Sequence, residues 1–157
     1  MANEISVRLQ GLKAATDKMV GLAPKLRRSG LRKAARQAMN IVRDDAKDRA
    51  RGLDDPETAE KIWKNIITQE SGRQGRREGG VVMKVGIRGG ASSNQYSKDA
   101  SGNPGGDTRH WRYLEFGTQH TPPAPFMRPA LSTNVNAVTD RFVQVLGQEI
   151  DAALRGK

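Results

Sequence analysis

The side chains that most often carry out chemistry in proteins are scarce in this sequence. The 157 residues include no cysteine and only two histidines, His110 and His120. Without cysteine there are no disulfides, thiolate nucleophiles or cysteine metal sites. Asp107 lies close to both histidines in the sequence, and the three together are the candidate for metal binding or acid–base catalysis. They lack a second carboxylate and an HExxH-like spacing. We therefore expect no catalytic residue, no metal site and no cofactor.

A glycine-rich run suggests a second kind of site, a phosphate-binding loop. Residues 101–107 read Ser-Gly-Asn-Pro-Gly-Gly-Asp. This run lacks the Gly-Lys-Ser/Thr ending of a nucleotide-binding loop and does not lead into a helix with an open N-terminus. It therefore predicts a flexible loop rather than a nucleotide site.

Positive charge is the strongest physical signal. The chain has 27 Lys and Arg against 17 Asp and Glu, a net charge of +10. Residues 24–51 hold ten basic and three acidic side chains, so this segment carries +7. Such a surface attracts polyanions and can neutralise phosphates without reading sequence; the alternative is a solvated helix face. No helix-turn-helix, zinc finger or RNP motif accompanies it. The candidate residues facing DNA or another polyanion are Arg27, Arg28, Arg32, Lys33, Arg36 and Arg43.

Aromatic and proline residues gather near the C-terminus. Residues 113–118 read Tyr-Leu-Glu-Phe-Gly-Thr, and residues 123–131 read Pro-Ala-Pro-Phe-Met-Arg-Pro-Ala-Leu. Glycine at 117 can supply an unusual backbone angle, and we expect Phe126 to anchor the extended segment in the core. The guanidinium of Arg128 can pair with a carboxylate such as Glu115, or with one on a neighbouring chain. A rigid segment of this kind is typical of a subunit contact rather than of a catalytic site.

One long amphipathic helix is predicted from Pro24 to Arg51. Small apolar residues recur there at spacings of three and four, which places them on one face. Proline suits the first helical position and Gly52 suits the end. Before this helix, residues 5–9 alternate like a short strand, and residues 12–22 can form a helical piece.

The remaining elements are shorter. Residues 61–70 predict a strand or a helix-to-strand step, with Trp63, Ile66 and Ile67 buried, and residues 81–87 predict a strand. The segments 71–80 and 89–107 are expected to be mobile loops, because they hold little apolar surface. Residues 113–118 alternate like a strand. A closing helix should begin at Pro129. Its predicted apolar stripe is Leu131, Val135, Val138, Phe142, Val145, Leu146, Ile150 and Leu154.

These elements predict a single domain over residues 1–157 of the α+β class. We expect a small, mostly antiparallel sheet with the long basic helix and the C-terminal helix packed on it, joined by long flexible hairpin loops. No apolar stretch approaches the roughly 18 residues that cross a bilayer. The first nine residues lack the apolar core of a signal peptide. Composition therefore predicts a soluble intracellular protein without a membrane partner.

The two C-terminal motifs resemble those of the tail-completion, or neck, proteins of long-tailed bacteriophages, of the minor tail protein Z type. Members typically carry Tyr-x-Glu-Phe-Gly-Thr, then Pro-x-Pro-Phe-apolar-Arg-Pro-Ala opening a C-terminal helix. The layout of a long basic helix, a hairpin and a closing helix extends the likeness over most of the chain. Many relatives have a Thr-Gly-x-Leu turn before the hairpin, where this chain has residues 55–60. The motif residues, which the resemblance assigns to subunit contacts, are Tyr113, Glu115, Phe116, Gly117, Pro125, Phe126, Arg128 and Pro129.

What the resemblance implies is a structural role without enzymatic activity. Such a protein belongs to the head–tail junction of a virion assembled in the host cytoplasm. The resemblance further implies a six-fold homo-oligomeric ring that completes the tail end and joins it to the head connector. Its partners are neighbouring neck and connector proteins, the tail tube and, non-specifically, packaged DNA in the channel. The alternative from the basic segment alone is a freestanding, non-sequence-specific nucleic-acid-binding protein.

Overall fold

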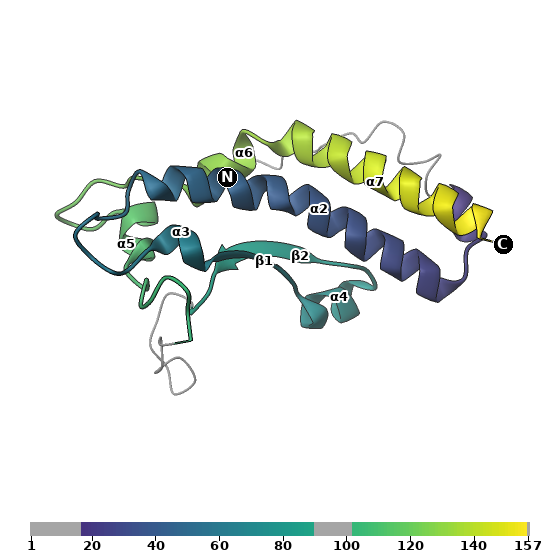
Figure 1. The fold of residues 1–157 in the computed structure, drawn as a ribbon, viewed down its shortest axis with the longest axis horizontal. Helices are drawn as coiled ribbons and strands as arrows, with labels where there is room; N and C mark the ends of the chain where they lie inside the picture. Colours follow the sequence, from purple (N-terminus) through teal and green to yellow (C-terminus); the bar gives the residue numbers. More distant parts are fainter. Residues whose placement is uncertain (1–16, 90–101, 157) are drawn as a thin grey trace.

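The computed structural model describes residues 17–89 and 102–156. Residues 17–20 are helical and precede the long helix α2. The chain is α+β, as predicted, with helices on a two-stranded antiparallel sheet (Figure 1). The elements in chain order are α2 (Pro24–Arg51), α3 (Ile62–Asn65), β1 (Ile66–Glu70), α4 (Gly72–Glu78), β2 (Met83–Ile87), α5 (Trp111–Phe116), α6 (Met127–Ser132) and α7 (Val135–Arg155).

Helix α2 has the bounds that the sequence predicts. Proline occupies its first turn, and the N–H of Gly52 donates to the carbonyls of Ala50 and Arg49 at its end. The buried residues recur every four positions, and most are small. They are Gly30, Ala34, Ala38, Val42, Ala46 and Ala50. A stripe of small residues lets neighbouring elements approach the helix axis closely, which makes α2 the centre of the fold.

The architecture is layered around α2. Figure 1 shows α7 running along one side of α2 and the sheet lying on the other side. Close approach of α2 and α7 is clearest at Gly30, where an added Cβ would lie 3.3 Å from the Cβ of Glu149. The basic helix therefore rests on the sheet, and the C-terminal helix rests on the basic helix.

The sheet follows from the predicted helix-to-strand step. The short helix α3 runs directly into β1, which pairs with β2 from Ile66 opposite Ile87 to Glu70 opposite Met83. Of the side chains expected to be buried in this step, Ile66 is buried, while Trp63 and Ile67 are only partly buried. The predicted strand at 81–87 is confirmed from residue 83 onward.

Two segments have a different structure from the one predicted. Residues 71–80 were expected to form a loop, but α4 occupies most of them, because arginine and glutamine favour a helix and Gly75 packs closely against Gly80. Residues 113–118 were expected to form a strand, but helix α5 covers 111–116. Six residues are too few to separate the two periodicities, since Trp111 and Leu114, three apart, also lie on one helical face.

The closing helix is divided in two. It was expected to begin at Pro129, but that proline lies inside α6, and α7 begins only at Val135. The break falls at Thr133 and Asn134, whose side chains bond to Asp45 of α2 and back to carbonyls of α6. These polar side chains compete with the helical hydrogen bonds at that point. Leu131 and Leu154, expected in the apolar stripe, are 50% and 46% exposed.

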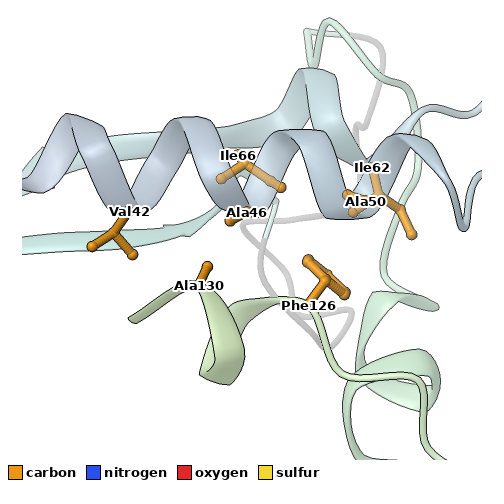
Figure 2. Close-up of a cluster of buried hydrophobic side chains, with 7 residues drawn as sticks. All are labelled: Val42, Ala46, Ala50, Ile62, Ile66, Phe126 and Ala130. Carbon is orange, nitrogen blue, oxygen red and sulfur yellow. The ribbon is translucent and has the colours of Figure 1, made fainter. Parts of the chain in front are cut away.

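Two apolar clusters hold the layers together. One gathers Met19, Leu22 and Ala34 with the α7 residues Val145, Leu146 and Ile150. The other surrounds Phe126, which is 0% exposed, so its predicted role as a core anchor is confirmed. Figure 2 shows Phe126 and Ala130 facing α2. The members of this cluster are Val42, Ala46, Ala50, Ile62, Ile66, Phe126 and Ala130.

The second predicted loop is described only at its ends. Residues 102–107 were expected to be mobile, but they are held against α3. The Asn65 side chain accepts from the N–H of Gly105 at 2.8 Å and donates to the carbonyl of Gly106 at 3.0 Å. The predicted strand at 5–9, the first part of the 12–22 segment and residues 90–101 lie outside the described residues. No helix in the described parts is both long and apolar enough to cross a membrane.

Replacing Phe126 with alanine tests the core. We expect Phe126→Ala to lower the free energy of unfolding by about 3–5 kcal/mol, because it removes a fully buried ring and leaves a cavity. Urea unfolding measures the loss. Tyr113→Ala is the control, because that ring is 62% exposed and should cost less than about 1 kcal/mol. Equal unfolding midpoints for the two variants would show that Phe126 does not support the core.

Candidate functional site

A buried carboxylate joins the two C-terminal sequence motifs. Glu115, at the end of α5, is 1% exposed. It accepts hydrogen bonds from the backbone N–H groups of Phe126 at 2.8 Å, Met127 at 2.9 Å and Arg128 at 3.0 Å. The Nε of Arg128 donates to the same carboxylate at 3.0 Å. We call this arrangement of Glu115 with residues 126–128 the Glu115 clamp.

The sequence of α6 creates the need for such a carboxylate. The first N–H groups of any helix lack partners within the helix, and Phe126 at the N-cap has no side-chain oxygen to supply one. The next position in the first turn of α6 is Pro129, which has no backbone N–H and so adds no further unpaired donor. Glu115 therefore satisfies the three free amides from outside the helix. A negative charge at this position is also favourable to the helix dipole.

The loop between α5 and α6 has the geometry that returns the chain to the clamp. Gly117 has φ 75°, in the region that favours glycine, and an added Cβ would lie 2.9 Å from the nitrogen of Pro123. The N–H of Ala124 donates to the carbonyl of Leu114 at 2.7 Å. The Thr118 hydroxyl accepts from the N–H groups of residues 120 and 121. Pro125 lies exposed in the segment that then enters the core at Phe126.

Two opposing effects act on the Glu115 carboxyl. Burial raises its pKa, but the N–H groups of Met127, Phe126 and Arg128, together with the Arg128 side chain, favour the charged form. The hydrogen bonds outweigh the burial, so the pKa of Glu115 lies below its ordinary value. The clamp thus contains an ionised carboxylate at neutral pH.

The outer side of the clamp is a stack of exposed side chains. Arg128 donates from Nη2 to the backbone carbonyl of Glu115 at 2.7 Å, and its guanidinium lies 5.1 Å from the centre of the Phe116 ring. Phe116 is 58% exposed and Tyr113 is 62% exposed. Of the two partners predicted for Arg128, Glu115 of the same chain is the one found. The bonds to Glu115 fix the guanidinium while most of the arginine side chain faces solvent.

An apolar groove continues from this stack. It is a hollow of about 340 Å³ between α2, β2 and α6, lined by Met39, Val42, Lys84, Val85, Met127, Arg128 and Leu131. Methionine, arginine and exposed aromatic rings are the side chains enriched at protein interfaces. Leu131 at the rim was predicted to face the core, so sequence reasoning missed this groove. Only the structure shows α6 turning that leucine outward.

The predicted polyanion-facing residues divide into two groups. Three are engaged by neighbours: Arg32 with Glu70, Lys33 with Glu149, and Arg43 with Asp44 and Asn40. The other three, Arg27, Arg28 and Arg36, form no ion pair with a described residue.

The candidate metal or acid–base residues are not gathered into a site. Asp107 pairs with the guanidinium of Arg109, which lowers the pKa of that carboxyl. His110 and His120 are both exposed. Over residues 17–89 and 102–156, no group of three or more acidic or histidine side chains is placed to hold a metal ion.

Comparison with known protein families identifies the family to which the chain belongs. A family model described as "Bacteriophage HK97-gp10, putative tail-component" matches residues 13–117, which is more than half of the chain. The matched range ends at Gly117, so it includes α2, the sheet and α5 with Glu115, and stops before the second C-terminal motif. Neither a curated protein nor a solved structure matches the chain.

The clamp predicts a defined dependence of stability on pH. Because the folded-state pKa of Glu115 is lowered, its ionisation stabilises the fold above the ordinary value of 4.5, and this contribution disappears as pH falls through the lower folded value. Glu115→Gln should therefore unfold more easily than wild type at neutral pH, with a difference that shrinks below about pH 4.5. Urea unfolding between about pH 7 and about pH 3 measures it.

A matched control separates the clamp from general charge effects. Asp151→Asn removes an exposed carboxylate from α7 and should change stability by less than about 0.5 kcal/mol at either pH. A difference between wild type and Glu115→Gln that stays constant with pH would contradict an ionised, stabilising Glu115.

Proposed function

Because the chain belongs to the HK97-gp10-like family of bacteriophage tail components, we propose that it is a non-enzymatic structural subunit of the virion neck. In this proposal identical copies form a ring that completes the tail end and joins it to the head connector, with the DNA channel passing through. Its partners are neighbouring neck, connector and tail-tube proteins.

The observation that carries the proposal is the exposed stack of Phe116 on Arg128 beside the apolar groove. Phe116 is 58% exposed and stacks on Arg128, which also lines the apolar groove, and contiguous exposed apolar surface of this kind marks an interaction site. The clamp fixes Arg128, so its guanidinium has little side-chain entropy to lose on association. The groove, lined by Met39, Val85 and Leu131, offers apolar surface next to that rigid stack.

The proposed assembly is a closed ring rather than an isolated pair. Rings arise from head-to-tail contacts between two different surfaces of one chain. The stack and its groove supply one surface, and a different face of the neighbouring copy supplies the other. The six-fold copy number is what the resemblance to neck proteins implies.

One observation favours the alternative function, a freestanding nucleic-acid-binding protein, and that observation is the basic first half of α2. Residues 24–36 hold six basic side chains and no acidic one. The membership of a tail-component family favours the neck subunit, because a virion component can meet DNA and still have a structural role. The two functions differ in whether phage particles depend on the chain for assembly.

Loss of the protein from a phage tests the proposed function directly. Without this chain we expect full heads and separate tails, because the junction between them is missing. Negative-stain electron microscopy of lysates, with complementation from a plasmid as the control, distinguishes joined from separate particles. Joined, infectious particles without the chain would contradict the neck assignment.

Changes to the stack should weaken the ring and leave the fold intact. Phe116→Ala removes the exposed ring. Arg128→Ala removes a largely exposed side chain, while Glu115 keeps its three backbone donors, so it should cost about 1 kcal/mol of stability. We expect both variants to shift from the ring mass toward the monomer in size-exclusion chromatography with light scattering.

The control for this experiment is Leu154→Ala, which removes a leucine of 46% exposure at the far end of α7. It should keep the wild-type mass. Unchanged ring formation by both stack variants would contradict this surface as the subunit contact, and a wild-type chain that stays monomeric at high concentration would contradict the ring.

A further inference from the structure

A basic groove lies between the first turns of α2 and the short helix α4. It has a volume of about 400 Å³. Two of its arginines, Arg27 and Arg28, come from α2, and the third, Arg76, comes from α4. The sequence separates Arg76 from the other two by almost fifty residues, so only the fold brings the three together.

The backbone around α4 explains why Arg76 reaches the groove. An added Cβ on Gly75 would lie 2.7 Å from the carbonyl oxygen of Gly80, and the N–H of Gly80 donates to the Gly75 carbonyl at 2.9 Å. Gly79, with φ 68°, turns the chain out of the helix. The chain thus folds back tightly on α4, and residues 79–81 form a wall of the groove with the arginine beside them.

Charge at this end of the molecule is poorly neutralised. Arg27, Arg28 and Arg76 form no ion pair with a described residue. Glu70 forms an ion pair with Arg32, and the hydrogen bond from Arg32 lowers the pKa of that carboxyl. The charges on Arg28 and Arg36 lower it further. The arginines of α2 therefore act together on a carboxylate in this region, as they would on any anion placed there.

We propose that this groove binds the phosphodiester backbone of duplex DNA. Guanidinium groups pair with phosphate oxygens through two hydrogen bonds at once, and three of them line one open hollow. Contacts to phosphate carry no sequence information, so binding of this kind is independent of sequence. The proposal deepens the neck function by giving its DNA contact a site, and it rests on that function only for the source of the DNA.

The competing occupant is an acidic segment of a second copy. Residues 53–60, at the other end of α2, hold four acidic side chains and no basic one. Asp54 is engaged in the fold, where it accepts from the N–H groups of Ile62 and Trp63. Apart from Asp54, that segment offers three carboxylates, whereas duplex DNA presents a continuous row of phosphates that is attracted by the whole net charge of +10. These observations favour DNA.

Fluorescence anisotropy with a short labelled duplex tests the site in the full-length protein. Wild type should bind at about 50 mM salt and release the duplex as salt rises. Combining Arg27→Ala, Arg28→Ala and Arg76→Ala should weaken binding about tenfold or more, and should reduce the slope of log affinity against log salt by roughly one unit per arginine. Arg76→Ala alone should weaken binding as much as Arg28→Ala alone.

Two controls make the result specific to the groove. Arg73→Ala removes the same charge from the same helix at a residue outside the groove and should keep wild-type affinity. Lys64→Ala, Arg88→Ala and Arg112→Ala together match the charge change of the triple variant at exposed positions elsewhere. Equal weakening by this control triple, or no duplex binding by wild type at about 50 mM salt, would overturn the proposal.

Light scattering on the same variants separates this proposal from the ring. If the groove triple keeps the ring mass and loses DNA, the inference holds. If it loses the ring and keeps DNA, the groove holds the acidic segment of a neighbouring copy and the inference is wrong. If wild type binds DNA through the groove but forms no ring, the neck proposal fails and the DNA site stands.

Discussion

The conformation of the C-terminal third of the molecule depends on a buried negative charge. An ionised carboxylate inside a protein is costly unless donors surround it, and Glu115 has four, three of them backbone N–H groups. Those donors point at the carboxylate only when α6 has formed and the 117–124 loop has its folded conformation. Burial of the carboxylate and formation of the first turn of α6 therefore depend on each other. This arrangement places Phe126 in the core between α2, α3 and β1.

The small-residue stripe of α2 is the second constraint, and it is what lets one helix serve two layers. The short side chains of alanine at 34, 38, 46 and 50 let neighbouring elements approach the axis of α2 closely. As a result, α7 lies against one side of α2 while the sheet lies against the other. The result is two separate apolar clusters rather than one continuous core. One cluster ties the C-terminal helix to the start of α2, and the other ties the Glu115 clamp to its end.

Sequence reasoning succeeded where one local pattern is long and failed where it is short. A stripe of small apolar residues that recurs from Gly30 to Ala50, with Pro24 at the first position and Gly52 after the last, defines α2 at both ends. Phe126 was placed in the core, and Glu115 was among the partners considered for Arg128. The six residues of α5 fit a strand as well as a helix, and α4 looked like a loop because glycine and arginine dominate it. The arginine groove needs both α4 and the tight return at Gly80, so no pattern within a single segment could reveal Arg76 as part of it.

The two proposed contact surfaces lie at different points along α2, and this separation has a physical consequence. The apolar groove beside the stack is lined by Met39 of α2, while the basic groove is lined by Arg28 and Leu31 near its start, beside α4 (Figure 1). The eight residues of helix from Leu31 to Met39 span about 12 Å, beyond the screening length of about 8 Å at physiological salt. A polyanion in the groove would therefore not alter the Phe116–Arg128 stack through charge alone. The proposed neighbour contact depends on apolar area and a fixed guanidinium, whereas the proposed DNA contact depends on the release of counterions from phosphate. Salt should therefore act strongly on the second and weakly on the first.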